Sequence, residues 1–237
     1  MRLLLINPNT STHITQRMAA SAQAALEPGD ELAAVTAATG PAAVRTAEQL
    51  RQADASAMTM AVAHAAGRDA IILAISLDGA ARDLRRRLPH LPVLGMTEAA
   101  LLTACLRVER VGLLTLGASL LPLFRRRAEE VGVACRMAAY EAVEAESAFS
   151  PADPDELPLL DLVTDGCGRL ADAGAQAVVL AGAVLCGYAD ALASRCRIPV
   201  LDGVECAVRQ ARVLHRMTGA GPMTHADTPA PAARPER

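Results

Sequence analysis

Short runs of apolar residues recur along this chain, and each run ends at a cluster of turn-forming residues. The first run covers residues 3–6 and stops at the polar segment 7–12, which reads Asn-Pro-Asn-Thr-Ser-Thr. Short apolar runs bounded by turn residues are typical of strands buried in a parallel sheet. The pattern predicts strands over residues 3–6, 31–37, 69–74, 92–95, 110–116, 135–141, 176–181 and 199–201.

Segments with helical spacing or helix-start signals separate these strands. They predict helices over residues 12–26, 42–67, 80–88, 99–107, 124–130, 159–174, 189–195 and 205–218. Alternating strands and helices of this size indicate an α/β fold with parallel sheets flanked by helices. The arginines between residues 82 and 87 are expected to face solvent, residues 149–156 to form a loop, and residues 219–237 a disordered tail.

The second half of the chain repeats the first. A shift of 107 residues places 70–74 on 177–181, 92–94 on 199–201 and Glu98 on Glu205. Matches of several kinds in one register favour two similar lobes with a cleft between them, although any two βαβ segments are somewhat alike. We expect a first lobe from residues 1–95 plus 204–218 and a second from 96–203.

The first turn has the geometry of an anion site. Asn7, Thr10 and Ser11 follow a strand, and Thr10 or Ser11 offers an N-cap for the next helix. Uncapped N–H groups and the helix dipole point into such a turn, which therefore suits an anion. The alternative is a well-capped helix with no ligand, and the spacing alone does not separate the two.

Composition narrows the classes of partner. The 23 basic and 26 acidic residues nearly cancel, and only two Phe, two Tyr and no Trp are present, which argues against nucleic acid. No apolar run reaches the length of a membrane span. The six cysteines form no CxxC pair and the histidines show no ligand spacing, so we expect no metal and a reduced cytoplasmic location.

Polar residues follow several strands of both predicted lobes. Because the carboxyl ends of parallel strands meet at one edge of each sheet, these exits should face a common cleft. Few of them carry charge, which suits a small polar ligand held by hydroxyls, amides and backbone N–H groups. They include residues 7–11, 76–78, 97–98, 115–119 and 182–186.

At this point the chain resembles the aspartate/glutamate/hydantoin racemase superfamily, particularly its hydantoin and allantoin racemase branch. The resemblance extends to about residue 217 and rests on several motifs together. They are residues 6–11 (Ile-Asn-Pro-Asn-Thr-Ser), 40–41, 69–80, 93–100 (Val-Leu-Gly-Met-Thr-Glu-Ala-Ala), 111–115, 179–183 and 199–203. It implies two pseudo-symmetric flavodoxin-like lobes, no cofactor and homo-oligomers.

The resemblance also implies a mechanism in which two cysteines, one per lobe, move a proton on opposite faces of a carbon. Here the first cysteine position holds Ile75 and the second holds Gly182, and neither exchanges a proton. A shift of one residue presents Ser76, an unassisted hydroxyl that is a poor base for a carbon acid.

Three residues are candidate catalytic groups. Cys186 is the thiol nearest the second position and is the candidate acid, with Asp78 opposite as base and Ser76 beside it. The competing interpretations are that Cys186 packs helix against sheet and that Asp78 caps the next helix. Glu98, paired by the repeat with Glu205, is either a second acid or an ordinary first-turn residue.

The remaining candidates are groups that would hold substrate oxygens. They are Asn7, Thr10, Ser11, Thr97, Glu98 and Thr115, with the backbone N–H groups of Gly182 and Ala183. The sequence therefore predicts a racemase- or epimerase-like enzyme acting on a small carboxylate, amino acid derivative or cyclic ureide. The alternatives are an arylmalonate decarboxylase-like lyase with a single thiol and a catalytically silent small-molecule-binding paralogue.

Overall fold

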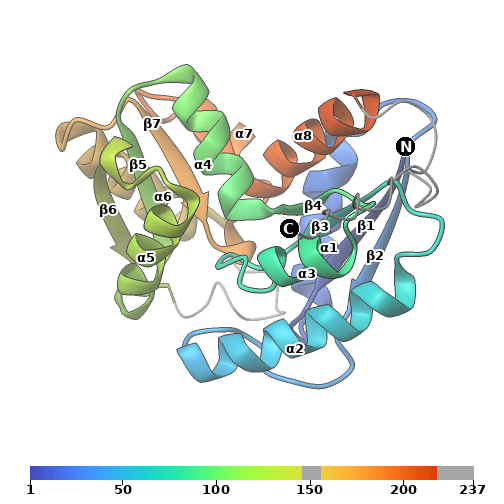
Figure 1. Ribbon diagram of the computed structural model, residues 1–237. Helices are drawn as coiled ribbons and strands as arrows, with labels where there is room; N and C mark the ends of the chain where they lie inside the picture. The colour runs from blue at the N-terminus through green and yellow to red at the C-terminus, as the bar shows by residue number, and fades with distance from the viewer. Residues whose placement is uncertain (146–155, 218–237) are drawn as a thin grey trace, which may run out of the picture.

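The computed structural model describes residues 1–145 and 156–217, which form two lobes, each built on a four-stranded parallel sheet (Figure 1). The predicted α/β fold with two similar lobes is confirmed. Of the loop expected over 149–156, only Glu156 is described, and the tail expected over 219–237 lies outside the described residues.

The first sheet has the strand order β2-β1-β3-β4, with all neighbours parallel. Its strands are fully buried where the sequence runs apolar, as at Leu3–Ile6, because helices cover both faces. The elements of this half are β1 (Arg2–Asn7), α1 (Thr12–Ala24), β2 (Glu31–Thr36), α2 (Ala47–His64), β3 (Ala70–Leu73), α3 (Ala81–Arg87) and β4 (Val93–Gly95).

The second sheet has the order β6-β5-β7-β8 and is also parallel throughout. Its elements are α4 (Met96–Arg107), β5 (Val111–Leu116), α5 (Leu121–Val131), β6 (Met137–Val143), α6 (Glu156–Asp172), β7 (Ala177–Ala181), α7 (Tyr188–Ala193), β8 (Val200–Asp202) and α8 (Gly203–Met217). Among the described residues, three short 3₁₀ turns accompany them, η1 (Ala118–Leu120), η2 (Ala134–Arg136) and η4 (Ala183–Leu185). Each strand thus has a counterpart in the same sheet position, β1 with β5 through β4 with β8.

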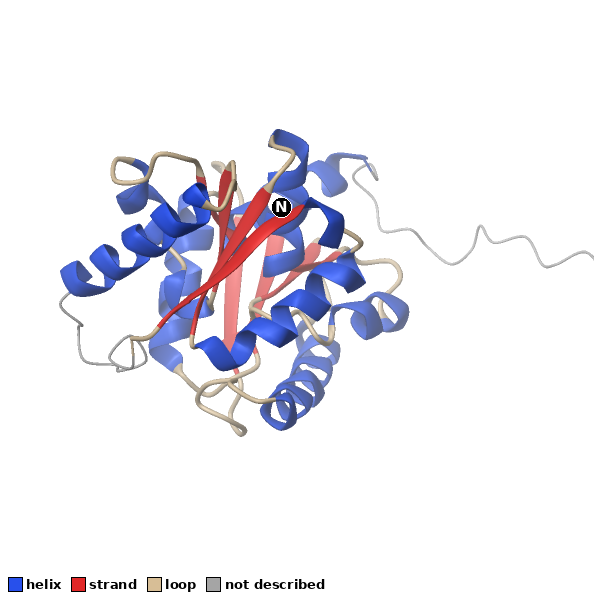
Figure 2. Ribbon diagram, turned by 90° about the vertical axis from the view of Figure 1, so that its left-hand side faces the viewer, coloured by secondary structure: helices blue, strands red, loops and turns tan. Residues whose placement is uncertain are grey.

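The two helices α4 and α8 join the lobes. α4 follows the last strand of the first sheet but packs on β7 of the second, whereas α8 follows the last strand of the second sheet and packs on β3 of the first. The two helices also pack against each other, and one apolar core runs through both lobes. Figure 2 shows the strands in the middle of the molecule with helices on either side.

α1 begins at Thr12 as predicted, whereas α2 begins later than predicted. Ser11 is at the N-cap of α1, but its side chain makes no cap hydrogen bond, and its hydroxyl donates to the Ala42 carbonyl instead, at 2.6 Å. α2 begins at Ala47 rather than 42 because Thr46 and Gln49 form a capping box there. The freed residues 40–46 form a loop tied to the first turn.

The arginines of the basic helix α3 are exposed to solvent, as predicted. Arg85 also binds both Glu98 carboxylate oxygens, at 3.0 and 2.8 Å, and the Val93 carbonyl. None of the described helices is both long enough and apolar enough to cross a bilayer.

Candidate functional site

A cavity of about 50 Å³ lies between the lobes, at the carboxyl ends of their strands. Both halves contribute to its wall, as the repeat predicts for a shared cleft. Its lining residues are Asn9, Ile14, Ala43, Val44, Ile75, Ser76 and Leu77 from the first half, and Thr115, Leu116, Leu120, Phe124 and Ala181–Val184 from the second.

Ser76 lines this cavity from the first lobe. It lies in the turn after β3, and its hydroxyl oxygen accepts a hydrogen bond from the backbone N–H of Ala183, at 2.9 Å, across the cleft. The Ser76 carbonyl in turn accepts the hydroxyl of Thr97. Ser76 is therefore held by two contacts from the second half of the chain, one to its side chain and one to its backbone.

Thr115 faces the same cavity from the second lobe. It lies near the end of β5, is completely buried, and its hydroxyl oxygen has no hydrogen-bond partner among the described residues. A buried hydroxyl left unpaired costs about 1–3 kcal/mol. An unpaired donor on a cavity wall therefore indicates the place where a ligand oxygen or nitrogen is recognised.

The β7 exit adds backbone groups to this wall. Gly182 is extended, with φ 175°, and is followed by the 3₁₀ turn η4. The N–H of Ala183 points to Ser76. The predicted catalytic residue Ser76 and the predicted binding residues Thr115, Gly182 and Ala183 thus meet in one cavity, and these roles stay predictions.

The first turn contributes one residue that the sequence did not single out. Asn9 lines the cavity and is 5% exposed. Asn7 lies behind it, fully buried, with its amide donating to Asn9 Oδ1 at 3.0 Å and Thr15 Oγ1 at 2.9 Å. The Thr10 N–H donates to the Pro41 carbonyl at 3.1 Å, so Asn7, Thr10 and Ser11 shape this turn and do not line the cavity.

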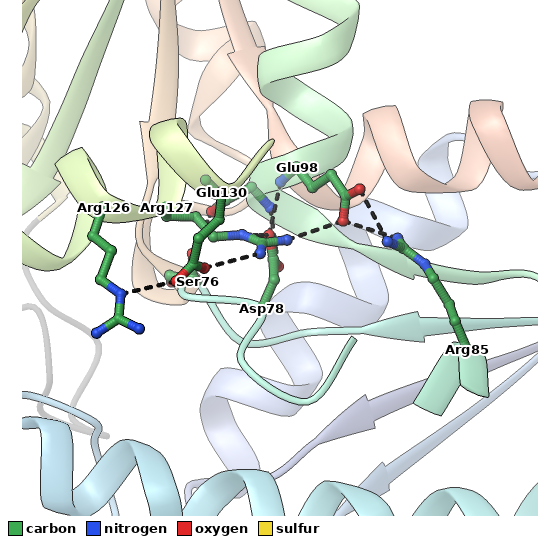
Figure 3. A network of polar contacts seen from close by, with 8 residues as sticks. Ser76, Asp78, Arg85, Glu98, Arg126, Arg127 and Glu130 are labelled. Atoms are coloured by element: carbon green, nitrogen blue, oxygen red, sulfur yellow. Dashed lines mark hydrogen bonds and ion pairs between the residues drawn. The ribbon is translucent and has the colours of Figure 1, made fainter. Parts of the chain in front are cut away.

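Asp78, Thr97 and Glu98 also lie outside the cavity wall, in a charged network beside it (Figure 3). The Asp78 carboxylate accepts the backbone N–H of Thr97 at 3.3 Å and of Glu98 at 2.7 Å. Complete burial raises the pKa of Asp78 to about 7, against the opposing effects of Arg127 and of these N–H groups. The carboxylate thus caps α4 and not the next helix, α3, whose start has no side-chain cap hydrogen bond, so the capping interpretation of Asp78 named the wrong helix.

Cys186 is placed away from the cavity wall. Its side chain is buried, and burial together with nearby Asp202 raises the pKa of the thiol well above its ordinary value. Burial likewise raises the pKa of Cys206 to about 11. Thiols in such surroundings are poor nucleophiles and poor bases at neutral pH. The catalytic role predicted for Cys186 therefore receives no support from its position.

These positions predict which thiols react. Iodoacetamide at pH 7 should modify the exposed Cys135 first and leave Cys186, Cys167 and Cys206, all buried, unmodified in the folded chain. Mass spectrometry of peptides from native and unfolded protein measures this directly. Cys135→Ser serves as the control that removes the fast site, and rapid labelling of Cys186 would show that its thiol reaches solvent.

Two residues of the site region gave no strong sequence signal. Phe124 and Arg127 both come from α5, where helical spacing puts them on one face. Phe124 lines the cavity and Arg127 reaches Asp78 with its Nε at 3.4 Å. One apolar and one basic residue on an amphipathic helix are too ordinary to stand out, because the pattern says nothing about which lobe that face meets.

Comparison with known proteins decides the family. A model of the Asp/Glu/Hydantoin racemase family matches residues 3–211. This chain belongs to that family. The chain is also 28% identical to a hydantoin racemase from Paenarthrobacter aurescens over 224 residues, covering 90% of this chain and 91% of the relative.

Solved structures agree with this assignment to the racemase family. An allantoin racemase from Pseudomonas fluorescens superposes with a TM-score of 0.85 and 26% identity, covering 100% of both chains. An arylmalonate decarboxylase superposes with a TM-score of 0.62 and 16% identity over 93% of this chain and 94% of the other, and shares the fold alone. The family model and the hydantoin and allantoin racemase relatives indicate that this chain is a racemase, a class of isomerase.

Within this racemase fold, the described cavity wall lacks the two thiols that the family resemblance implies. Ile75 and Gly182, which occupy the positions where the family resemblance places thiols, both line it. Its described protic side chains are the hydroxyls of Ser76 and Thr115 and the amide of Asn9, and no carboxylate, imidazole, thiol or amine is among its lining residues. The wall therefore offers hydrogen-bond donors and proton donors but no strong base.

Proposed function

We propose that this chain is a cofactor-independent enzyme that binds a small carboxylate or cyclic ureide in the inter-lobe cavity and moves a proton at an activated carbon. The observation that carries the proposal is the unpaired, buried hydroxyl of Thr115 opposite Ser76 in a cavity shared by both lobes. Carboxylates and ureides carry oxygens that such donors bind, and the family membership supports the reaction class.

Ser76 is the proposed proton-transfer group. The N–H of Ala183 that binds its oxygen stabilises negative charge there, so the hydroxyl gives up its proton more readily than an isolated serine. Thr115, Asn9 and the backbone of Gly182 would hold the substrate oxygens. In a racemisation, Ser76 would serve one face of the carbon, and water or a substrate group the other.

The absence of a strong base from the described cavity wall favours one second candidate, a decarboxylase. Loss of carbon dioxide from a malonate-type substrate leaves the bonding electron pair on the α-carbon without any base. The O–H of Ser76 then donates its proton to that carbon, and water reprotonates the serine oxygen. A hydroxyl suffices for that step, whereas removal of an α-proton requires a base.

One assay separates these functions. The protein is incubated in deuterated buffer with a 5-substituted hydantoin, allantoin or phenylmalonate, and isotope content, optical rotation and released carbon dioxide are measured. Deuterium uptake with loss of optical activity supports the racemase, and carbon dioxide release supports the decarboxylase. Tight binding with no turnover of any probe would contradict both and identify a silent binding protein.

Thr115→Val tests the site within the same assay. Because valine has nearly the same shape but no hydroxyl, we expect about a tenfold loss of affinity for the probe that binds, the cost of one buried hydrogen bond. Thr59→Val, at an exposed position on α2 outside the cavity, is the matched control. Equal affinity of the Thr115 variant and the wild type would remove Thr115 from the binding site.

The proposal also covers the cellular compartment and the oligomeric state of the enzyme. All six cysteines are free, which supports a reduced cytoplasmic compartment. A homo-oligomer is proposed from the family resemblance and from the exposed apolar side chains Leu106, Val213 and Leu214 on α4 and α8.

A further inference from the structure

Each half of the molecule holds a buried carboxylate at the start of the helix that crosses to the other lobe. In the second half this carboxylate belongs to Asp202, at the end of β8. Its Oδ1 accepts the N–H groups of Val204 at 2.8 Å and Glu205 at 3.1 Å, and its Oδ2 accepts the N–H of Gly187 at 2.6 Å. Asp202 thus caps α8 and also fastens the loop after β7.

In the first half the equivalent cap comes from a loop elsewhere in the chain and not from the residue before the helix. The 107-residue repeat aligns Asp202 with Gly95, which has no side chain. The backbone N–H groups of Thr97 and Glu98, aligned with Val204 and Glu205, instead bind Asp78 from the loop after β3. A Cβ built on Gly95 would lie 2.3 Å from Asp78 Cγ, so the Asp78 carboxylate fills the space that a side chain at residue 95 would take.

This arrangement imposes costs that a plain helix cap would avoid. Asp78 has φ 51°, the left-handed conformation that is uncommon for a residue with a side chain, and its carboxylate is completely buried. A cap supplied from residue 95 would not need the left-handed conformation, because the backbone there is extended, with φ −83° and ψ 139°. What Asp78 adds is a connection between α4 and the loop that carries Ser76.

The second lobe holds that connection through Arg127. This side chain is 12% exposed, with its Nε 3.4 Å from Asp78 Oδ2 and its guanidinium 3.0 Å from Glu98 Oε2 and 3.5 Å from Glu130 Oε2 (Figure 3). The loop residue two positions before Asp78 is Ser76, whose hydroxyl meets Ala183. The contacts thus run from α5 through Asp78 to the cavity and back to the second lobe.

We infer that Asp78, anchored by Arg127, is a positioning residue that sets Ser76 against Ala183 across the cleft. The value of this for catalysis rests on the proposed function, but the positioning itself does not. The competing explanation is that Asp78 serves only as the cap of α4.

A transferred cap separates the two explanations. In the double variant Asp78→Gly/Gly95→Asp, the new carboxylate has the space and the extended N-cap backbone from which to cap α4 and pair with Arg127. Glycine at 78 suits the left-handed conformation. The variant therefore keeps the cap but removes the side chain that joins it to the Ser76 loop.

The readout is amide hydrogen exchange and melting temperature of the ligand-free protein. Asp78→Gly alone should lower the melting temperature and speed the exchange of the amides of Thr97, Glu98 and Ala183. The double variant should recover the melting temperature and the protection of Thr97 and Glu98. The amide of Ala183, in the other lobe, should stay about tenfold faster than in the wild type, because its acceptor Ser76 is no longer held.

Wild-type protection of Ala183 in the double variant would overturn the inference and leave Asp78 as a cap alone. If that variant does not fold, Arg127→Met gives the second test. It leaves both cap hydrogen bonds of Asp78 in place, and exchange should rise at Ala183 but not at Thr97. The matched control is Arg126→Met, which removes an exposed arginine paired with Glu130. Unchanged exchange at Ala183 in Arg127→Met would also overturn the inference, and none of these outcomes depends on finding a substrate.

Discussion

The double variant Ile75→Cys/Gly182→Cys is expected to racemise a 5-substituted hydantoin about 10²–10⁴ times faster than the wild type, the usual contribution of placed acid–base groups. The two positions line one cavity from opposite lobes, so a thiol from each reaches a different face of the substrate carbon. The site accepts the change, because a Cβ on Gly182 would meet its nearest neighbour at 3.5 Å, an ordinary contact, and its backbone is extended.

The two single variants are the controls for this experiment. One thiol alone exchanges a proton on one face, so either single variant should incorporate deuterium without racemising at a comparable rate. The measurement is chiral chromatography of the hydantoin together with its isotope content. A folded double variant that binds the hydantoin yet racemises no faster than the wild type would show that residues 75 and 182 do not face one carbon.

Asp202→Ala is expected to lower the free energy of unfolding by about 3 kcal/mol, because it removes the acceptor of three backbone N–H groups at a buried site. For a chain of this size that corresponds to a melting temperature lower by about 6–12 °C. Denaturant unfolding and thermal melts measure both quantities.

Asp190→Ala is the control for this prediction. Asp190 is an exposed acidic residue in the first turn of α7, and its removal should change the free energy of unfolding by less than about 0.5 kcal/mol. A comparably small effect for Asp202 would mean that water replaces the carboxylate at the three N–H groups.

Apolar runs and their repeat predict the fold of this chain well, because a buried strand leaves a direct trace in the sequence. The runs at residues 69–74 and 176–181 became β3 and β7, which hold equivalent places in the two sheets. The same reasoning placed Ser76 and Thr115 at strand exits, and both line the cavity.

The division between residues that face the cavity and residues that support it could not be predicted in the same way. Asn7 and Asn9 are chemically identical and two positions apart, yet one lines the cavity and the other holds the turn together. The Asn7 amide is held by Asn9, Thr15 and the Ser11 carbonyl, and a pattern of apolar and polar positions does not show which side chains make such bonds. Asp78 was likewise visible as a carboxylate at a strand exit, but not its partner Arg127, which comes from another lobe.

The exchange of helices between the lobes has a consequence for how the chain unfolds. α4 packs on β7 and α8 on β3. Each sheet is therefore covered by a helix that follows directly after a strand of the other sheet. A fragment that ends after β4 would lack α8. The apolar face of β3 would then be exposed, because no other helix of the fragment takes that place. The two lobes resemble a pair of domains, but they are bound to gain and lose their structure as one cooperative unit.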